Sequence, residues 1–305
     1  MTDDRRLWGK LNNPDLALDQ VQVGVLGIPF DSAASHRRGT AFGPEAIRAA
    51  SRRYHPLTET CQDLSGLRVR DFGDVAADAL DQHDTYADID RQVGEMAAHG
   101  IIPCSLGGDH SVTFPVIRAL SKQPPRSHVG GSDRIGILWI DAHPDLMPIY
   151  GGHKFSHACP LRRAMELDEV DPTKVVMLGI RKVEPAEWQF MVGERIQTFT
   201  AHEMSRHPIQ WIAERVKSRL LGVQRLYWSI DIDVLDPACA PGTGVPTPGG
   251  LTTRQLFDLI HALSDLPVSG FDLVEVSPPY DQAEITAFAA AATIMEMFGV
   301  VASAR

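Results

Sequence analysis

Short runs of apolar residues recur along the chain, and each run ends near glycine, proline, aspartate or histidine. Runs of this length are typical of strands that are buried on both faces of a parallel sheet. They predict eight strands, at Val21–Phe30, Leu67–Asp71, Ile101–Leu106, Ile135–Ile140, Val175–Ile180, Arg195–Phe199, Leu226–Ile230 and Val268–Val276.

Helical patterns lie between these apolar runs. One of them has Pro44 at its first position, where the missing N–H of proline costs nothing. The predicted helices are Pro44–Tyr54, Asp88–His99, Phe114–Lys122, Pro160–Leu167, Ala201–Leu221, Thr253–Leu263 and Ala283–Phe298. Strands that alternate with helices predict an α/β fold with three layers, in which helices cover both faces of a mostly parallel sheet of about eight strands.

Three further segments bear on the domain organisation. The polar segment Ser121–Arg134 is interpreted as a surface loop and not as a linker, because the motifs on either side of it build one site. The whole chain 1–305 is therefore predicted to be one domain, with residues 1–20 as an N-terminal extension. The apolar stretch Ile285–Ala302 is interrupted by polar residues, and a bilayer span needs about 20 apolar residues. We expect a buried helix there.

Composition and charge exclude some classes of function. The chain of 305 residues carries a net charge of −10, and its basic residues form no run longer than a pair. Binding to nucleic acid rests on clustered lysine and arginine, so we expect no nucleic-acid partner. The four cysteines form no CxxC pair, which favours a reduced, cytoplasmic setting. The first residues lack the apolar core of a secretory signal, and we expect no membrane partner.

Polar clusters follow three of the predicted strands directly. They are Gly107–Ser111 (GGDHS), Asp141–Asp145 (DAHPD) and Asp231–Pro237 (DIDVLDP). In open α/β sheets, ligands bind in the crevice beyond the carboxyl ends of the strands. We therefore expect these three clusters to converge on one site.

The charge of such a site calls for bound cations. If the segments after the strands are extended, alternate residues share a face. Packed carboxylates repel one another, and burying them without compensation is costly. Four carboxylates and two neutral imidazoles carry a charge of −4, which two divalent cations neutralise. Oxygen-rich ligands without thiolate suit Mn²⁺. The candidate ligands are His110, Asp141, His143, Asp145, Asp231 and Asp233.

These motifs together resemble the ureohydrolases, the family of arginase, agmatinase and guanidinobutyrase. The resemblance rests also on Gly27–Asp31 (GIPFD), on Gly39–Arg48, on Ser229–Gly244, and on Asp272–Val276 with the PPYD that follows it. It covers nearly the whole chain, with the motifs in the family's order. It implies an arginase-like fold, two Mn²⁺ ions, and a homotrimer or homohexamer.

The resemblance also implies an assignment of ligands. One ion would be held by His110, Asp141, Asp145 and Asp231. The other would be held by Asp141, His143, Asp231 and Asp233, so that Asp141 and Asp231 bridge both ions. Asp141 then also belongs to the catalytic centre. Asp109 and Asp236 are better interpreted as capping or supporting groups than as ligands.

The chemistry of two metal ions predicts a mechanism. The ions lower the pKa of a water molecule towards about 7, and the hydroxide attacks a guanidinium carbon to release urea and an amine. By resemblance, His157 donates the proton that the amine needs, and Glu275 holds the guanidinium. The alternatives are that His157 caps the next helix, that His153 is the proton donor, and that Glu275 forms an ion pair with a buried arginine. Cys159 is interpreted as a small buried residue and not as a nucleophile.

The resemblance implies a small cationic guanidino substrate, and the group at the other end of that substrate, its tail, distinguishes the members of the family. The loop Leu146–His153 offers few donors for an amino-acid carboxylate, which argues against free arginine. The signature at Asp231–Gly250 resembles that of agmatinase, so we expect hydrolysis of agmatine to putrescine and urea. His153 and Thr243 are further candidates for substrate binding. Activities on guanidinobutyrate, guanidinopropionate, arginine or guanidine are the alternatives within the family.

Two alternatives belong to other classes. A deacetylase with one zinc ion has a related fold and an Asp-x-His ligand pattern, but it should lack the histidine of GGDHS and the last carboxylate of DAHPD. A homologue without catalytic activity would be expected to have lost ligands, and this chain keeps all six ligand positions together with His157 and Glu275. Both alternatives are therefore less favoured than a ureohydrolase.

Overall fold

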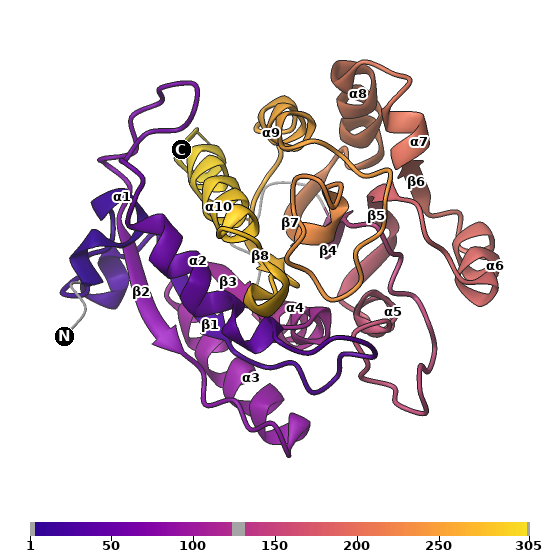
Figure 1. Cartoon of the computed structure of the whole chain (residues 1–305), viewed down its shortest axis with the longest axis horizontal. Coiled ribbons are helices and arrows are strands. Elements are labelled where there is room, and N and C mark those ends of the chain that lie inside the picture. Colours follow the sequence, from indigo (N-terminus) through magenta and orange to yellow (C-terminus); the bar gives the residue numbers. More distant parts are fainter. Residues whose placement is uncertain (1–3, 124–131, 304–305) are drawn as a thin grey trace.

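The computed structural model describes residues 4–123 and 132–303, and Figure 1 shows how their helices and strands are arranged. Eight strands form one sheet in the order β2-β1-β3-β8-β7-β4-β5-β6, and every neighbouring pair is parallel. The strands are β1 Val23–Ile28, β2 Val69–Asp74, β3 Ile102–Gly107, β4 Ser132–Ile140, β5 Val170–Ile180, β6 Gln197–Thr200, β7 Val223–Asp231 and β8 Gly270–Val274.

Helices cover both faces of this sheet, which confirms the predicted three-layer α/β fold. In Figure 1, α3, α4 and α5 lie in the lower half of the view and α8, α9 and α10 in the upper half. The helices are α1 Leu7–Lys10, α2 Gly43–Ser51, α3 Gln82–Ala98, α4 Thr113–Ser121, α5 Pro160–Met165, α6 Pro185–Gly193, α7 Ala201–Met204, α8 Ile209–Arg219, α9 Thr253–Ala262 and α10 Ile285–Ser303.

The alternation of side chains in the strands divides the core into two layers. In β4, Leu138 and Ile140 pack with the apolar faces of α2, α8, α9 and α10. Ile137 and Trp139 point the other way and pack with α3, α4, α5 and α6. Because both faces of the central strands are buried, these strands are apolar throughout, as the sequence predicted.

The C-terminal helix α10 is buried in the first of these layers. It is long and apolar enough to cross a bilayer by length and composition, but 72% of its most apolar window is buried inside the protein. Its side chains pack against α2 and α9, and the ring of Phe298 lies 6.0 Å from that of Trp8 in an edge-to-face contact. The prediction of a buried helix is therefore correct.

The helices differ from the prediction at two places. The helix predicted over Ala201–Leu221 is two helices, α7 and α8, because Pro208 lies between them and cannot continue a helix. The helix α6 was not predicted at all. Its apolar residues Trp188 and Val192 are exposed while Glu187 is buried, so its sequence lacks a single apolar face.

The edges of the sheet also differ from the prediction. Strand β2 was expected to be buried on both faces, but its residues become progressively exposed after Val69 because it is an edge strand. Residues 4–20 pack against this edge of the sheet, where the indole Nε1 of Trp8 donates a hydrogen bond of 3.0 Å to Asp71 Oδ2. Residues 124–131, most of the predicted loop 121–134, lie outside the described residues.

Candidate metal centre

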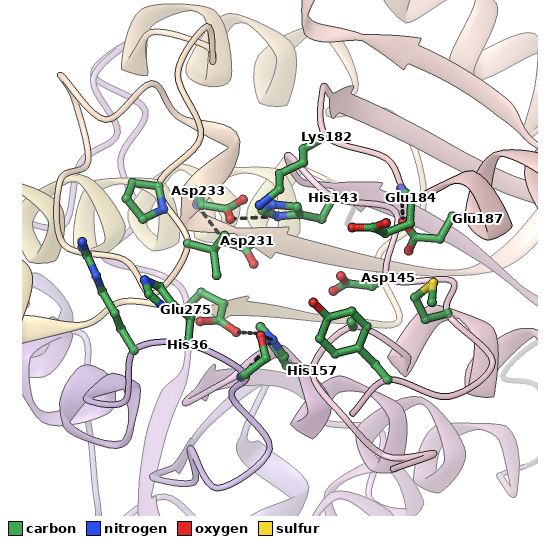
Figure 2. A pocket seen from close by; sticks show the side chains of 17 residues that line it. His36, His143, Asp145, His157, Lys182, Glu184, Glu187, Asp231, Asp233 and Glu275 are labelled. Carbon is green, nitrogen blue, oxygen red and sulfur yellow. Dashed lines mark hydrogen bonds and ion pairs between the residues drawn. The ribbon is translucent and has the colours of Figure 1, made fainter. Parts of the chain in front are cut away.

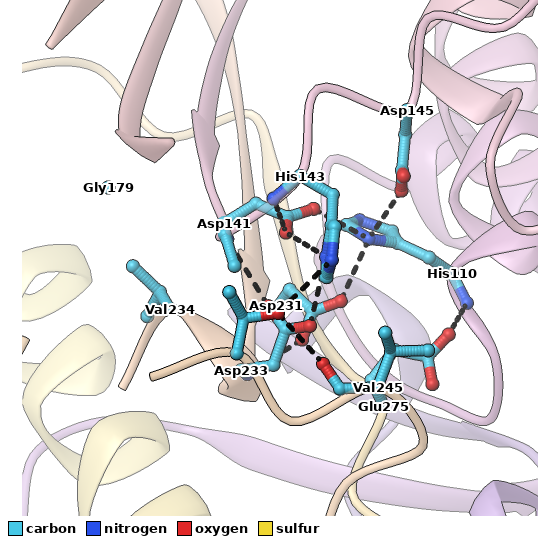
Figure 3. A network of polar contacts seen from close by, with 12 residues as sticks. His110, Asp141, His143, Asp145, Gly179, Asp231, Asp233, Val234, Val245 and Glu275 are labelled. Carbon is cyan, nitrogen blue, oxygen red and sulfur yellow. Dashed lines mark hydrogen bonds and ion pairs between the residues drawn. The ribbon is translucent and has the colours of Figure 1, made fainter. Parts of the chain in front are cut away.

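The polar clusters of the sequence meet because four central strands end at the same edge of the sheet. Strands β3, β8, β7 and β4 are adjacent and parallel, so their carboxyl ends lie side by side. The GGDHS, DAHPD and DIDVLDP segments begin at three of these ends. Figure 3 shows the six side chains that gather there: His110, Asp141, His143, Asp145, Asp231 and Asp233.

Carboxylates surround His110 on one side. Its Nδ1 lies 3.1 Å from Asp141 Oδ2 and 3.1 Å from Asp145 Oδ2. The Oδ2 atom of Asp231 is 3.2 Å away. Within the described part of the chain, His110 Nδ1 and Asp141 Oδ2 are buried but form no hydrogen bond of good geometry. Buried polar atoms that converge without satisfying one another are what the ligands of a cation look like.

A second group of ligand atoms forms around His143. Its Nδ1 lies 3.1 Å from Asp233 Oδ2 and 3.6 Å from Asp141 Oδ1. Asp141 thus contributes one oxygen to each group, as expected of a bridging carboxylate. Asp231 lies in the first group, and its Oδ1 accepts a hydrogen bond of 2.7 Å from the Asp233 N–H.

These side chains point toward one another because the segments that carry them form turns, and not because they are extended. After β4 the chain bends, and Asp145 adopts a φ of +53°, in the left-handed region that non-glycine residues rarely occupy. After β7 a single 3₁₀ turn, Ile232–Val234, carries Asp233. The six predicted side chains do come together, but the extended segments whose alternation was the reason for that prediction are turns in the structure.

The lysines and arginines of the described residues do not balance the charges in this cluster. Burial and the Asp141 charge raise the pKa of Asp145 to about 6. Burial, Asp233 and Asp141 likewise raise the pKa of Asp231. Within residues 4–123 and 132–303, no lysine or arginine forms an ion pair with any of the four carboxylates, and the nearby Arg181 donates to backbone carbonyls instead. The donor set, with two imidazoles, therefore fits two divalent cations.

A hydrogen-bonded chain behind His110 fixes its orientation. The Ser229 hydroxyl lies 2.9 Å from His110 Nε2 and donates a bond of 2.7 Å to Asp272 Oδ1, and the Tyr227 hydroxyl donates to Asp272 Oδ2. The indole of Trp139 stacks on the imidazole at 4.2 Å. Because Nε2 is engaged in this way, Nδ1 is left to face the carboxylates. Sequence reasoning saw Asp272 only as part of a motif.

A pocket of about 530 Å³ opens over the cluster, and Figure 2 shows its lining. Four of the candidate ligands form its floor. Five segments add the walls: the loops between β1 and α2, between β4 and α5 and between β7 and α9, the segment after β5 with the start of α6, and the residue after β8. The wall residues are Ser35, His36, Arg37, Met147, Tyr150, His157, Ala158, Lys182, Glu184, Glu187, Val245, Pro246 and Glu275.

Glu275 faces this pocket from a strained position. Strand β8 ends at Val274, not at Val276 as predicted, and Glu275 has a φ of +65°. Its Oε1 accepts the His110 N–H at 2.9 Å and lies 3.3 Å from Nδ1 of His157. Among the described residues no arginine pairs with it, so the alternative of a structural Arg–Glu pair is wrong. Strain of this kind gathers at functional sites.

His157 lies against Glu275 and does not cap a helix. Its backbone N–H donates to the Ala33 carbonyl at 3.2 Å, and the N-cap residue of α5 is Cys159. Burial lowers the pKa of His157, but the hydrogen bond to Glu275 and the charges of Glu275, Asp145 and Asp109 outweigh burial and raise it to about 9. The contact with Glu275 therefore favours a proton on the His157 ring, at the Nδ1 atom that faces the carboxylate.

Two candidates for substrate binding do not reach the pocket. The side chain of His153 is exposed outside the lining, and its backbone pairs with Tyr150 across a tight turn. Thr243 is buried and likewise does not line the pocket. The structure therefore does not support His153 as the proton donor.

Cys159 is fully buried, and burial raises the pKa of its thiol to about 11, so it is no thiolate.

Asp109 and Asp236 hold loops, as the sequence predicted for supporting groups. Asp109 is fully buried, and its Oδ2 accepts the Ala33 N–H at 2.9 Å. Asp236 Oδ2 accepts the Gly249 N–H at 2.7 Å. The neighbouring Gly108 has no space for a side chain, because a Cβ there would lie 1.9 Å from the Phe30 carbonyl oxygen. The GGDHS segment is thus packed tightly against the loop that follows β1.

Several pocket residues were missed by sequence reasoning. Lys182, Glu184 and Glu187 follow β5 and begin α6, the helix that was not predicted, and Ser35 and Arg37 come from the loop after β1. Glu187 is buried, and its oxygens accept the N–H groups of Leu146 and Glu184, both at 2.9 Å. Glu187 two residues after Pro185 is a weak signal for the start of a helix. No feature of the local sequence places Glu187 beside Asp145.

A third group of possible ligand atoms lies on the surface, between α9 and the loop before β2. It consists of Glu59, Asp258 and His261. Arg254 already neutralises it, with an ion pair to Glu59 and a contact of 3.6 Å to Asp258. His261 Nε2 lies 2.7 Å from Oε2 of the buried Glu296. We interpret this group as an ion-pair network.

Comparisons with known proteins agree with this site. The sequence profile described as the arginase family matches residues 21–299. The chain is 36% identical to a guanidinobutyrase from Pseudomonas aeruginosa, over 93% of this chain and 88% of that protein. It is 37% identical to an agmatinase from Bacillus subtilis, over 92% and 91% of the two chains. The structure of a proclavaminate amidino hydrolase from Streptomyces clavuligerus superposes with a TM-score of 0.87 at 31% identity, covering 96% and 95% of the chains.

Proposed function

The chain belongs to the arginase family, whose members hydrolyse guanidino groups at a binuclear metal centre, and we propose that it splits a linear ω-guanidino compound into urea and an amine with two Mn²⁺ ions bound. The observation that carries the proposal is the meeting of six candidate ligand side chains with Glu275 and His157 around one pocket. A single-zinc site would not use both the His110 group and the His143 group.

The two groups of ligand atoms would each hold one ion, with Asp141 shared between them. When bound, the ions would lower the pKa of a water molecule towards neutrality and supply the hydroxide for attack on the guanidinium carbon. Ligands with many oxygens and no thiolate favour manganese over a structural zinc ion. The proposed metal is therefore Mn²⁺.

Glu275 is the residue that would hold the substrate guanidinium. Its carboxylate lines the pocket and is 5% exposed, and a planar guanidinium can donate two parallel hydrogen bonds to a carboxylate. The bond from the His110 N–H fixes Oε1 and thereby ties the position of the substrate carbon to the ligand segment. His157, on the same carboxylate, would donate a proton to the nitrogen of the leaving amine.

Agmatine, the substrate predicted from the sequence, remains one proposal for the tail. Met147, Tyr150, Val245 and Pro246 give the pocket apolar wall that suits a chain of methylene groups. Glu184 and Glu187 are acids that a terminal amine could approach, and Figure 2 shows them on the side of Asp145. An amine at the far end of the substrate would face these acids while Glu275 holds the guanidinium.

An ω-guanidino acid is the second proposal, and unpaired cations in the pocket favour it. Within residues 4–123 and 132–303, Arg37 and Lys182 form no hydrogen bond or ion pair through their side chains. Arg37 lies over the ring of Tyr280 at 4.9 Å, with its charge unneutralised. Both oxygens of Glu187 are already occupied by backbone N–H groups. A terminal carboxylate would therefore find more free partners than a terminal amine.

The experiment is urea release by the manganese-loaded protein from agmatine, 4-guanidinobutyrate, 3-guanidinopropionate, arginine and guanidine. Release of urea from at least one of them is expected, and no urea from any would overturn the proposed function. The variant Arg37→Glu should lower kcat/KM for the guanidino acids and spare agmatine if the tail is a carboxylate. Lys174→Glu, far from the pocket, is the matched control. A change in kcat/KM of Arg37→Glu for agmatine alone would favour the amine tail of agmatine.

A further inference from the structure

A residue outside the motifs of the sequence lies against the proton donor. Ser35, in the loop between β1 and α2, places its Oγ 2.7 Å from Nε2 of His157. The Ser35 backbone N–H donates to the same nitrogen at 3.1 Å. The other ring nitrogen, Nδ1, faces Glu275 at 3.3 Å. His157 is thus held at both nitrogens, by a carboxylate inside the pocket and by a serine at its rim.

These contacts determine where the proton sits on the neutral ring. A backbone N–H can only donate, so Nε2 accepts, and Nδ1 carries the hydrogen that points to Glu275. The Ser35 hydroxyl can donate to Nε2 while the ring is neutral and can accept the Nε2 proton when the ring is charged. Ser35 is exposed, so water reaches its Oγ. It is a link between the ring and solvent in both protonation states.

The loop that presents Ser35 is fixed by the metal-ligand segment. Asp109, which precedes the ligand His110, accepts the Ala33 N–H at 2.9 Å. The Ala33 carbonyl in turn accepts the His157 N–H at 3.2 Å. The serine, the histidine and the ligand segment therefore form one connected unit, and Ser35 is not a chance contact of a free loop.

We propose that Ser35 is the positioning residue of His157 and relays protons between this ring and solvent, an inference that rests on the proposed hydrolysis. As Nδ1 gives its proton to the leaving amine, Nε2 takes the Ser35 hydroxyl proton, and Oγ takes one from a solvent acid. One proton leaves the solvent acid, one arrives at the amine, and the charge of the ring is unchanged. Without the hydroxyl, this transfer has no partner at Nε2 except water.

The test is urea release by Ser35→Ala, Ser35→Thr and the control Ser32→Ala across a range of pH. Ser32 is in the same loop, but its hydroxyl donates to the Ala79 carbonyl at 2.8 Å and does not reach the pocket. General acid–base catalysis contributes about 10²–10⁴-fold, so losing its relay should lower kcat by roughly 10- to 100-fold with KM nearly unchanged. Imidazole buffer should restore part of the kcat of Ser35→Ala, and Ser35→Thr should retain most of the activity.

Other outcomes would overturn the inference. An unaltered kcat and pH profile in Ser35→Ala would show that catalysis needs no relay. A rise in KM alone would show that Ser35 binds substrate instead. If no compound yields urea, the proposed function fails by itself, and the contact is tested on the metal-free protein by ¹⁵N NMR of the imidazoles. Ser35→Ala, unlike Ser32→Ala, should move the His157 Nε2 resonance. An unmoved resonance would overturn the role of Ser35.

Discussion

Two clusters of histidines and carboxylates balance their charges differently. The strand-end cluster consists of His110, Asp141, His143, Asp145, Asp231 and Asp233, and the surface cluster consists of Glu59, Asp258 and His261. At the surface, Arg254 pairs with Glu59 and approaches Asp258. At the strand ends, Asp141, Asp231 and their neighbours have no such arginine among the described residues. Histidine and carboxylates in proximity therefore do not by themselves indicate a metal. What indicates it is a surplus of negative charge that the protein leaves uncompensated.

Burial separates the two clusters further. The side chain of Asp141 is fully buried, whereas those of Glu59 and Asp258 are 30% and 43% exposed. Water screens the repulsion between exposed carboxylates, but it cannot do so in the strand-end cluster. The surface cluster is stable as an ion-pair network, and the strand-end cluster requires cations. Each of the following predictions tests this difference.

The largest expected effect is on activity. Asp233→Ala removes a ligand oxygen next to His143. Loss of a group that only supports a ligand lowers metal affinity or activity by about 10- to 100-fold. Loss of a ligand itself should therefore lower the rate of urea release by more than about 100-fold. Asp258→Ala in the surface cluster is the matched control and should leave urea release unchanged. Urea release by Asp233→Ala at the normal rate would show that the binuclear mechanism is wrong.

The second effect is on thermal stability. A ligand that binds only the folded state at 100 times its Kd stabilises it by about 2.7 kcal/mol. Removing Mn²⁺ with a chelator should therefore lower Tm by several degrees, and mass spectrometry of the native protein should count two ions. Arg254→Ala should leave that count at two. A third ion in the unmodified protein would mean that the surface cluster binds metal as well.

The third effect is on the titration of His157 in the metal-free protein. Its pKa is raised from 6.5 to about 9, so Glu275→Gln should lower it, as seen by NMR. Because the folded state holds this proton more tightly, the stabilisation is complete below pH 6.5 and is lost as the pH rises through about 9. The difference in unfolding free energy between the two proteins should shrink over that range. Glu296→Gln, beside His261, should not move the His157 titration.

The smallest effect is expected where the protein supplies its own cation. Arg254→Ala breaks an ion pair whose arginine side chain is 56% exposed. Exposed pairs contribute about 0–1 kcal/mol, so denaturant unfolding should show a loss within that range. A loss of several kcal/mol would mean that the surface cluster is as poorly solvated as the strand-end cluster.

Much of the fold could be predicted because its signals are local. All eight strands were found from their apolar runs, and the six ligand candidates were found because each follows such a run. The helix α6 was missed because its apolar residues face solvent beside a buried Glu187. The left-handed backbone at Asp145 and Glu275 was missed because no residue preference signals it. These two positions owe their conformation to their surroundings.

The sequence by itself determined which residues end the central strands, and with them the identity of the charges that meet. Only the tertiary structure decided which of those charges stay unbalanced and which side chains they contact. Arg254 lies 195 positions from Glu59, and Ser35 lies 122 positions from His157. Strand formation depends on the periodicity of neighbouring residues, whereas charge compensation and proton transfer depend on distances in space. The folded chain sets those distances, and the local pattern of residues does not contain them.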